Sequence, residues 1–313
     1  MNSKKDSLNI TANFRTTSIV FPIFNGLIHT KIGLVELYKS IANSNSFKDF
    51  NVIIIDDGST DNSSEWISKN YPQIHLLKGN GNLWWSGGMN LGLDFAFNKL
   101  KSDYVLCWNN DIIPSSNYFG ELNKVLINHD GQSLICSKIL YKESPNIIFA
   151  YGCYFNEKNG KIVINGNLQP DENYKHQIQV DWAGGMGTII SNSIFKQVKY
   201  FNNNDFPQYK GDADYCLRAK ELGFHLFAVP ELKIWNDVSN TGLGFYNSTF
   251  KNFIRSFTAI NSSFNLKVHL HFIKRHCKSS KAQAYFYLMN QFISYILGYV
   301  LNRFKFKKKE YLS

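Results

Sequence analysis

The strongest constraint on the fold is a regular alternation of short β-branched runs and helical patterns over the first third of the chain. Four runs, TSIVF, NVIII, IHLL and YVLCW, predict buried strands at 17–21, 51–55, 74–77 and 104–108. Apolar residues at helical spacing follow the first and third runs: Leu27, Leu34, Tyr38 and Ile41, then Met89, Leu93, Ala96 and Leu100. Strands that alternate with helices predict an α/β fold with a mostly parallel sheet, covered on both faces and connected right-handed.

Polar clusters directly follow three of these predicted strands. They are the pair Asp56 and Asp57, the loop from Gly79 to Gly88, and the segment 109–111. Ligands of such sheets bind at the carboxyl ends of the strands, so we expect the three clusters to line one crevice. The loop is not G-x-G-x-x-G and the chain has no P-loop motif, which excludes the dinucleotide and P-loop classes. Carboxylates bind an anionic diphosphate only through a divalent cation.

Charge and cysteine usage narrow the class of protein. The formal charge of +10 predicts an anionic partner, and five separated cysteines without C-x-x-C predict neither a zinc site nor a disulfide framework. A reducing cytoplasm fits this usage. Residues 1–15 lack the apolar core of a signal peptide and are expected to be flexible. A nucleic-acid partner is not expected, because the chain has no basic stripe interleaved with aromatics before the C-terminal region.

Residues 238–313 form a basic, aromatic-rich segment that predicts helices. Its apolar part, Tyr285 to Leu301, is 17 residues long and interrupted by polar residues, which is marginal for a membrane span. Basic residues that suit anionic headgroups flank this part: Lys278, Lys281, Arg303, Lys305, Lys307, Lys308 and Lys309. We therefore expect peripheral attachment at the inner face of the cytoplasmic membrane. A helical appendage packed on the first domain, or a transmembrane helix, remains an alternative.

Six motifs occur in the order seen in family 2 glycosyltransferases, and the chain resembles this family, especially its bacterial rhamnosyltransferase-like branch, over about residues 17–237. The motifs are FPIFNG (21–26), IIIDDGSTD (53–61), GNGNLWWSGGMNLG (79–92), YVLCWNNDIIP (104–114), WAGGMGTIISNSIFKQV (182–198) and GDADYCLRAKELGF (211–224). The resemblance implies a GT-A fold at 16–237, in which a nucleotide sugar binds at the strand ends. Its sugar passes to an acceptor hydroxyl with inversion.

The resemblance also implies roles for single residues. Asp111 stands at the last position of the family's D-x-D motif and would bind Mg²⁺ or Mn²⁺, and Asp212 matches the general base. The positions expected to contact the donor are Pro22, Asp56, Asp57, Gly79, Trp85, Gly88, Asn90 and Asn110. Those expected beside the acceptor or the donor sugar are Trp84, Trp182, Gly184, Gly185 and Asp214. The chain departs from the family at Gly211, where an acidic residue is usual, and at Asn236, where many relatives carry a histidine that assists the metal.

The chemistry supports two separate carboxylates. Displacement at an anomeric carbon needs a base near the acceptor hydroxyl and a cation that offsets charge on the departing diphosphate. Metal coordination suppresses basicity, so Asp111 and Asp212 would divide the two roles.

Each assignment has a simpler alternative. Asp212 could be only the N-cap of the helix that follows, with Asp214 as the base. Asp56 and Asp57 could form an Asx turn before Gly58, Asp111 could be a solvated strand end, and Asp61 could be a cap. The run 184–187 could serve close backbone packing alone. An extended segment would point Trp84 and Trp85 in opposite directions, one into the core and one into the pocket; both could also be core.

The sequence thus predicts a metal-dependent inverting hexosyltransferase. Its donor would be a UDP- or dTDP-linked sugar, and its acceptor a lipid-linked oligosaccharide in the assembly of a bacterial O-antigen or capsule. A non-catalytic nucleotide-sugar or carbohydrate-binding protein on the same fold is the alternative, favoured by Gly211 and Asn236.

Overall fold

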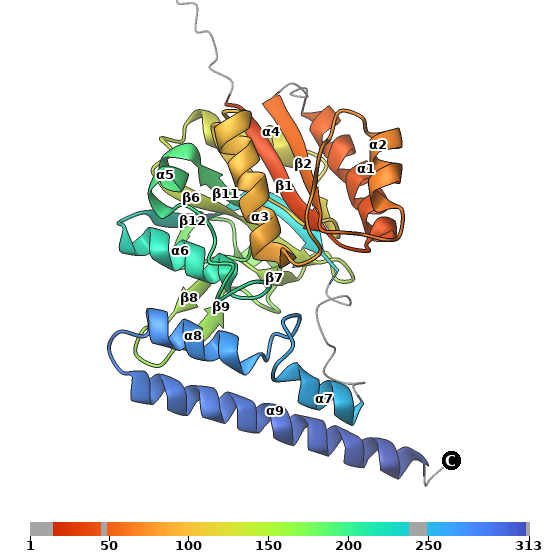
Figure 1. The fold of residues 1–313 in the computed structure, drawn as a ribbon. Helices are drawn as coiled ribbons and strands as arrows, with labels where there is room; N and C mark the ends of the chain where they lie inside the picture. Colours follow the sequence, from red (N-terminus) through yellow and green to blue (C-terminus); the bar gives the residue numbers. More distant parts are fainter. Residues whose placement is uncertain (1–14, 45–48, 238–248, 311–313) are drawn as a thin grey trace, which may run out of the picture.

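The computed structural model describes residues 15–44, 49–237 and 249–310 (Figure 1). All but one residue of the predicted flexible N-terminus, and the predicted boundary at 238, lie outside these ranges. The basic side chains predicted at Arg303, Lys305 and 307–309 also lie outside the described part of the chain.

A ten-stranded sheet forms the centre of the molecule, with its main path in the order β10-β12-β6-β11-β4-β1-β2-β3. β5 pairs with β12 and β7 pairs with β6 beside this path. The strands are β1 (Thr17–Ile23), β2 (Phe50–Asp56), β3 (His75–Lys78), β4 (Tyr104–Cys107), β5 (Ile112–Pro114), β6 (Ser133–Tyr141), β7 (Ile148–Ala150), β10 (Ile178–Val180), β11 (Thr188–Ser191) and β12 (His225–Asn236). β1 to β4 pair in parallel, whereas β11 runs antiparallel to β4 and β6. The predicted mostly parallel sheet is confirmed.

Helices cover both faces of this sheet (Figure 1). One buried cluster packs α1, α2 and α4 against one face, and a second packs α3, α5 and α6 against the other. The helices are α1 (Leu27–Asn43), α2 (Ser63–Asn70), α3 (Trp84–Asp94), α4 (Tyr118–Ile127), α5 (Asn192–Val198) and α6 (Gly211–Glu221). A π-helical turn, η2 (Phe95–Lys99), continues α3, and a short 3₁₀ turn, η3 (Asp171–Asn173), precedes β10. The predicted helix after the third strand is therefore confirmed, but it is α-helical only to Asp94 and π-helical from Phe95 to Lys99.

Two glycines let α3 lie directly on β1. A Cβ at Gly88 would lie 2.6 Å from Pro22 Cβ, and one at Gly92 would overlap Val20. No larger residue fits this approach without moving the helix. The contact places the N-terminus of α3 beside the carboxyl end of β1.

The strand predicted at 17–21 is two residues too short, because β1 continues through Pro22 to Ile23. Val20 accepts a hydrogen bond from Trp108 N on the β4 side, and Ile23 accepts one from Asp57 N on the β2 side. Pro22, two residues after Val20, therefore faces the β4 side. Pairing with β4 has already ended at Val20, so the missing N–H removes no ladder hydrogen bond.

The predicted C-terminal helices are confirmed as α7 (Phe250–Ser256), α8 (Leu266–His276) and α9 (Lys281–Glu310). They lie below the sheet and its covering helices, with α8 next to a hairpin of β8 (Cys153–Phe155) and β9 (Ile162–Ile164) (Figure 1). Phe272 of α8 and Leu288 of α9 share a buried cluster with Phe206 and Leu217. The segment thus packs on the rest of the chain, as one alternative expected. No helix in the described ranges is both long and apolar enough to cross a bilayer.

Candidate active site

The carboxylate of Asp57 organises the glycine loop at the strand ends. It is buried and accepts hydrogen bonds from three backbone N–H groups: Gly81 (2.8 Å), Leu83 (2.8 Å) and Trp84 (3.0 Å). Unpaired N–H groups at a helix start attract a negative charge, so Asp57 fixes the first turn of α3. A Cβ at Gly79 would lie 2.5 Å from Asp57 Oδ1, which explains the glycine there.

Asp56 is also engaged within the protein. Its Oδ1 accepts from Ser59 N (2.8 Å), and its Oδ2 accepts from the Ser64 hydroxyl. This is the turn before Gly58 that the alternative interpretation expected. Asp61 is the expected cap, since its Oδ2 accepts from Leu27 N (2.8 Å) at the start of α1. Asp56 and Asp57 are thus both bonded within the protein, and their contact with a nucleobase stays a prediction.

The segment 109–111 follows β4 and enters the same crevice. Asn109 Oδ1 accepts from the indole Nε1 of Trp85 (3.2 Å), and Asn110 Nδ2 donates to Thr30 Oγ1 (2.9 Å). A Cβ at Gly33 would overlap the carbonyl of Asn110, so α1 packs tightly under the segment. The structure therefore brings the glycine loop and this segment together, as predicted.

Asp111 differs from the other carboxylates of the crevice. Its Oδ1 is buried and has no hydrogen-bond partner among the described residues. Burial raises the pKa of Asp111, and a hydrogen bond from its own backbone N–H and the charge of Lys142 offset this only in part. An ionised carboxylate in this position is costly without a nearby cation.

Sequence analysis missed Asp237 beside Asp111. β5 and β12 pair antiparallel with Ile112 opposite Asn236, so Asp111 and Asp237 are neighbours across the two strand ends. Lys142 Nζ lies 3.2 Å from Asp237 Oδ2. Asp237 directly follows Asn236 in the sequence, but only the pairing of β5 with β12 shows where it lies.

Asp111 and Asp237, the latter paired with Lys142, are the carboxylates at these strand ends that could hold a divalent cation. No group of three or more His, Cys, Asp or Glu side chains able to hold a metal occurs among the residues that the structure describes. Mg²⁺ and Mn²⁺, however, are commonly held by one or two carboxylates together with substrate phosphates and water. The partnerless Oδ1 of Asp111 is the kind of ligand that such a site requires.

Asp212 lies in the first turn of α6. Its Oδ2 accepts from Gly185 N (3.1 Å) and its Oδ1 from Ala213 N (2.8 Å). The residue that caps α6 is Lys210, so Asp212 is inside the helix and is not its N-cap. Burial raises the pKa of Asp212, which increases its basicity once it is ionised.

Trp85 connects the two halves of the crevice. Its ring lies on Gly185, where a Cβ would overlap the indole, and its Nε1 reaches Asn109 on the other side. Gly184 lies beside Asp212, with a Cβ there only 3.7 Å from Oδ2. Gly185 thus serves close packing, as the alternative interpretation of 184–187 expected, and Gly184 lies next to the candidate base.

The expectation for Trp84 and Trp85 is wrong in its geometry. They are the first two residues of α3 and do not form an extended segment. Both rings are half-buried, and Trp84, whose N–H donates to Asp57, has a positive φ of 55°. The interpretation that both rings belong to the core is also not met.

Four predicted site residues do not face the crevice. Asp214 is fully buried and bonded to Arg218 and to α8. The Asn90 amide binds both backbone groups of Phe201 (2.8 and 2.9 Å), and Gly88 is covered by Pro22. Trp182 packs against two apolar clusters, with its Nε1 buried and unpaired among the described residues.

Three comparisons place the chain among known proteins. A model of glycosyl transferase family 2 matches residues 18–186. The low-salt glycan biosynthesis hexosyltransferase Agl10 of Haloferax volcanii is 28% identical over 179 residues, 56% of this chain and 54% of that protein. A crystal structure of GalNAc-T7 with UDP, GalNAc and Mn²⁺ matches with a TM-score of 0.57 and 13% identity, covering 86% of this chain and 56% of that chain. The chain spans about half the length of these relatives, and the predicted GT-A type fold is confirmed.

The structure explains the unusual Gly211 and generates a prediction. A Cβ at this position would overlap Ser86 Oγ and lie 3.0 Å from Phe206 O. We expect Gly211→Ala to lower the free energy of unfolding by about 1–3 kcal/mol, as measured by urea denaturation. Combining it with Ser86→Ala should cost less than the sum of the two single changes, because the hydroxyl that is overlapped is gone. Additive losses would show that Ser86 is not what excludes a side chain.

Proposed function

The chain belongs to glycosyl transferase family 2, and on this basis we propose that it transfers a hexosyl group from a nucleoside diphosphate sugar to a hydroxyl of a glycan acceptor, inverting the anomeric configuration. The observation that supports this most is the pair of carboxylates on the two sides of Trp85. Asp111 adjoins Asn109, which binds the indole nitrogen, and Asp212 is held by Gly185, on which the ring lies.

Asp212 acts as the general base in this proposal. Its carboxylate accepts the proton of the acceptor hydroxyl while the oxygen attacks the anomeric carbon, and one displacement inverts that carbon. Gly185 N–H orients the carboxylate, and burial gives it a pKa above the usual range of an aspartate. Asp111, with Asp237 beside it, would bind the divalent cation that offsets charge on the departing diphosphate.

The donor is proposed to be a UDP- or dTDP-linked sugar. Asp56 and Asp57 lie at the ends of β2 and beneath the glycine loop, where an N3–H of a pyrimidine could donate to a free lone pair. The neighbour of similar fold was crystallised with UDP and Mn²⁺, which is consistent with this choice. The alternative of a non-catalytic binding protein keeps only Asn236 as its support, since packing against Ser86 explains Gly211.

The acceptor is proposed to be lipid-linked, in assembly of a bacterial surface polysaccharide, at the inner face of the cytoplasmic membrane. Residues 249–301 contain seven Lys and Arg and no Asp or Glu. Apolar side chains at least 40% exposed line α9: Tyr285, Phe286, Met289, Ile293, Ile296, Leu297, Val300 and Leu301. Exposed apolar side chains on a basic helix suit the surface of a bilayer with anionic lipids.

The proposed base is tested by Asp212→Asn. The amide oxygen can still accept from Gly185 N, so folding and donor affinity should change little, whereas kcat should fall by about 10²–10⁴. The wild-type rate should rise with pH through a pKa above that of an ordinary aspartate, and this acid limb should vanish in the variant. Asp181→Asn, which also alters a partly buried carboxylate bonded to a backbone N–H, is the control and should stay active. Normal turnover by Asp212→Asn would remove it as the base.

The proposed metal ligand is tested by Asp111→Asn. Since the carboxylate would bind the cation directly, the Mn²⁺ concentration for half-maximal transfer should rise at least about tenfold. Asp103→Asn is the matched control, because Asp103 lies at the opposite end of β4 and binds Thr16. An unchanged Mn²⁺ response in Asp111→Asn would contradict the assignment.

The proposed membrane surface is tested with vesicles. The protein should sediment with vesicles containing phosphatidylglycerol, less with phosphatidylcholine alone, and less at high salt. Replacing Phe286 and Leu297, 61% and 54% exposed, with Ser should weaken binding at least about tenfold without lowering the melting temperature. Ile127→Ser, at a 57% exposed position on α4, should bind like the wild type. Equal binding by all variants would contradict this surface.

A further inference from the structure

Helix α8 contacts the first turn of α6 on both sides of Asp212. Two residues before Asp212, Lys210 Nζ lies 4.6 Å from the ring centroid of Phe272. Two residues after it, Asp214 Oδ1 accepts a hydrogen bond from His276 Nε2 (3.0 Å) and forms an ion pair with Arg275 Nε (2.9 Å). Phe272, Arg275 and His276 all belong to α8, which follows α6 in the chain by more than forty residues. Asp212 therefore lies between two anchors that the C-terminal segment supplies.

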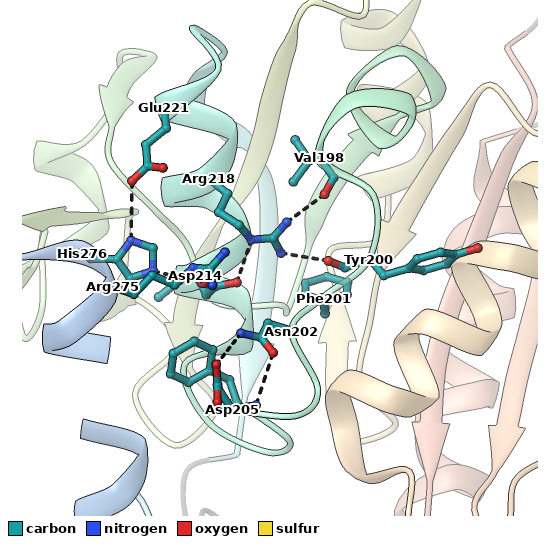
Figure 2. Close-up of polar contacts among 12 residues, drawn as sticks. Val198, Tyr200, Phe201, Asn202, Asp205, Asp214, Arg218, Glu221, Arg275 and His276 are labelled. Carbon is teal, nitrogen blue, oxygen red and sulfur yellow. Dashed lines mark hydrogen bonds and ion pairs between the residues drawn. The ribbon is translucent and has the colours of Figure 1, made fainter. Parts of the chain in front are cut away.

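The anchor at Asp214 is a closed polar cluster (Figure 2). The Asp214 carboxylate is 0% exposed and also accepts from Arg218 Nε (2.8 Å) on its own helix. Burial by itself would raise the pKa of Asp214, but His276 and Arg218 outweigh it and hold the pKa below the usual range. Arg218 also donates to the carbonyls of Val198 and Tyr200, at 2.8 Å each. Asp214 thus joins α6, α8 and the segment after α5 at one point.

Apolar contacts surround this cluster. Phe272 makes edge contacts with Phe155 (5.5 Å between ring centroids) and Phe206 (5.9 Å). His276 is only 2% exposed and lies against Phe272. A polar contact shielded from water in this way is stronger and more geometrically selective than the same contact at a surface.

The first turn of α6 needs such outside support. Its N-cap, Lys210, has a left-handed φ of 65° and makes no capping hydrogen bond with its side chain. Without a side-chain cap, the orientation of this turn depends on contacts from other elements. α8 supplies two of them.

We infer that α8 positions the catalytic base: Arg275 and His276 hold Asp214, and through it keep the Asp212 carboxylate oriented against Gly185 N–H. This inference rests on the proposed function, in which Asp212 is the base. Arg275 and His276 are positioning residues, because they act through Asp214 and touch no reacting group. α8 therefore links two parts of the protein: it shares a buried cluster with α9, the helix proposed to lie on a lipid surface, and it contacts α6, which carries the base.

His276 is the residue to change, because its removal leaves Asp214 short of a buried donor. His276→Leu should lower kcat about tenfold or more, while the KM for the donor changes less than about twofold. The acid limb of the pH–rate profile should move to lower pH as Asp212 becomes more hydrated. His276→Gln, which keeps an N–H donor near the imidazole Nε2 position, should recover most of the rate.

Lys138→Met separates positioning from general loss of stability. Lys138 of β6 is 2% exposed and pairs with Asp171 of η3, so its loss breaks a buried ion pair that involves neither α6 nor α8. It should lower the melting temperature without altering the kcat or the pH profile. Where His276→Leu does not fold, Arg275→Gln is the second variant, since the Arg275 side chain is 44% exposed and its loss is milder.

The outcomes distinguish this inference from the proposed function. His276→Leu or Arg275→Gln with wild-type kcat and pH profile, despite a lower melting temperature, would overturn the positioning role. If Asp212→Asn is inactive at the same time, the base assignment stands and only the role of α8 falls. If Asp212→Asn is fully active, the proposed base is wrong and the positioning role is wrong with it.

Discussion

The rest of the site depends on the carboxylate of Asp57 and the three N–H groups that it accepts from the glycine loop and from Trp84. This contact starts α3 at Trp84, and the starting point determines where Trp85 lies. Trp85 can then rest on Gly185 and reach Asn109 with its indole nitrogen. Gly88 and Gly92 allow the same helix to lie directly on β1. A single buried acid at the end of β2 therefore determines the geometry on both sides of the crevice.

Asp111 and Asp212, the two candidate catalytic carboxylates, have pKa values raised by the same cause, but their hydrogen-bond partners differ. Burial acts on both. Asp212 receives two backbone N–H groups, which leave it ionisable and oriented, whereas Asp111 keeps a bare oxygen next to Asp237. The first environment suits a base and the second suits a cation. The proposed division of roles rests on hydrogen bonding, because neither residue type nor burial distinguishes the two.

β1 to β4 and their parallel pairing could be predicted because periodicity and β-branched runs are local properties of the sequence. The tryptophan segment could not, since a carboxylate 27 residues away caps the helix that the glycines permit. Asp214 shows the same limit: its partners Arg275 and His276 come from α8, so nothing near Asp214 in sequence marks it as buried. Asp237 became visible only through the register of β5 with β12. The motifs pointed to the strand ends as the site, but they could not separate aspartates bonded within the protein, such as Asp57 and Asp214, from the candidate reactive ones.

The most direct test of the central claim is a crystal structure of the protein with Mn²⁺ and an unreactive nucleoside diphosphate sugar. The account predicts an anomalous peak within about 2.0–2.4 Å of Asp111 Oδ1, bridged to the diphosphate. It also predicts that the anomeric carbon faces the Asp212 carboxylate, with Trp85 between the Asp111 side and the Asp212 side of the site. A diphosphate bound away from Asp111, or an anomeric carbon that Asp212 cannot reach through an acceptor oxygen, would contradict it.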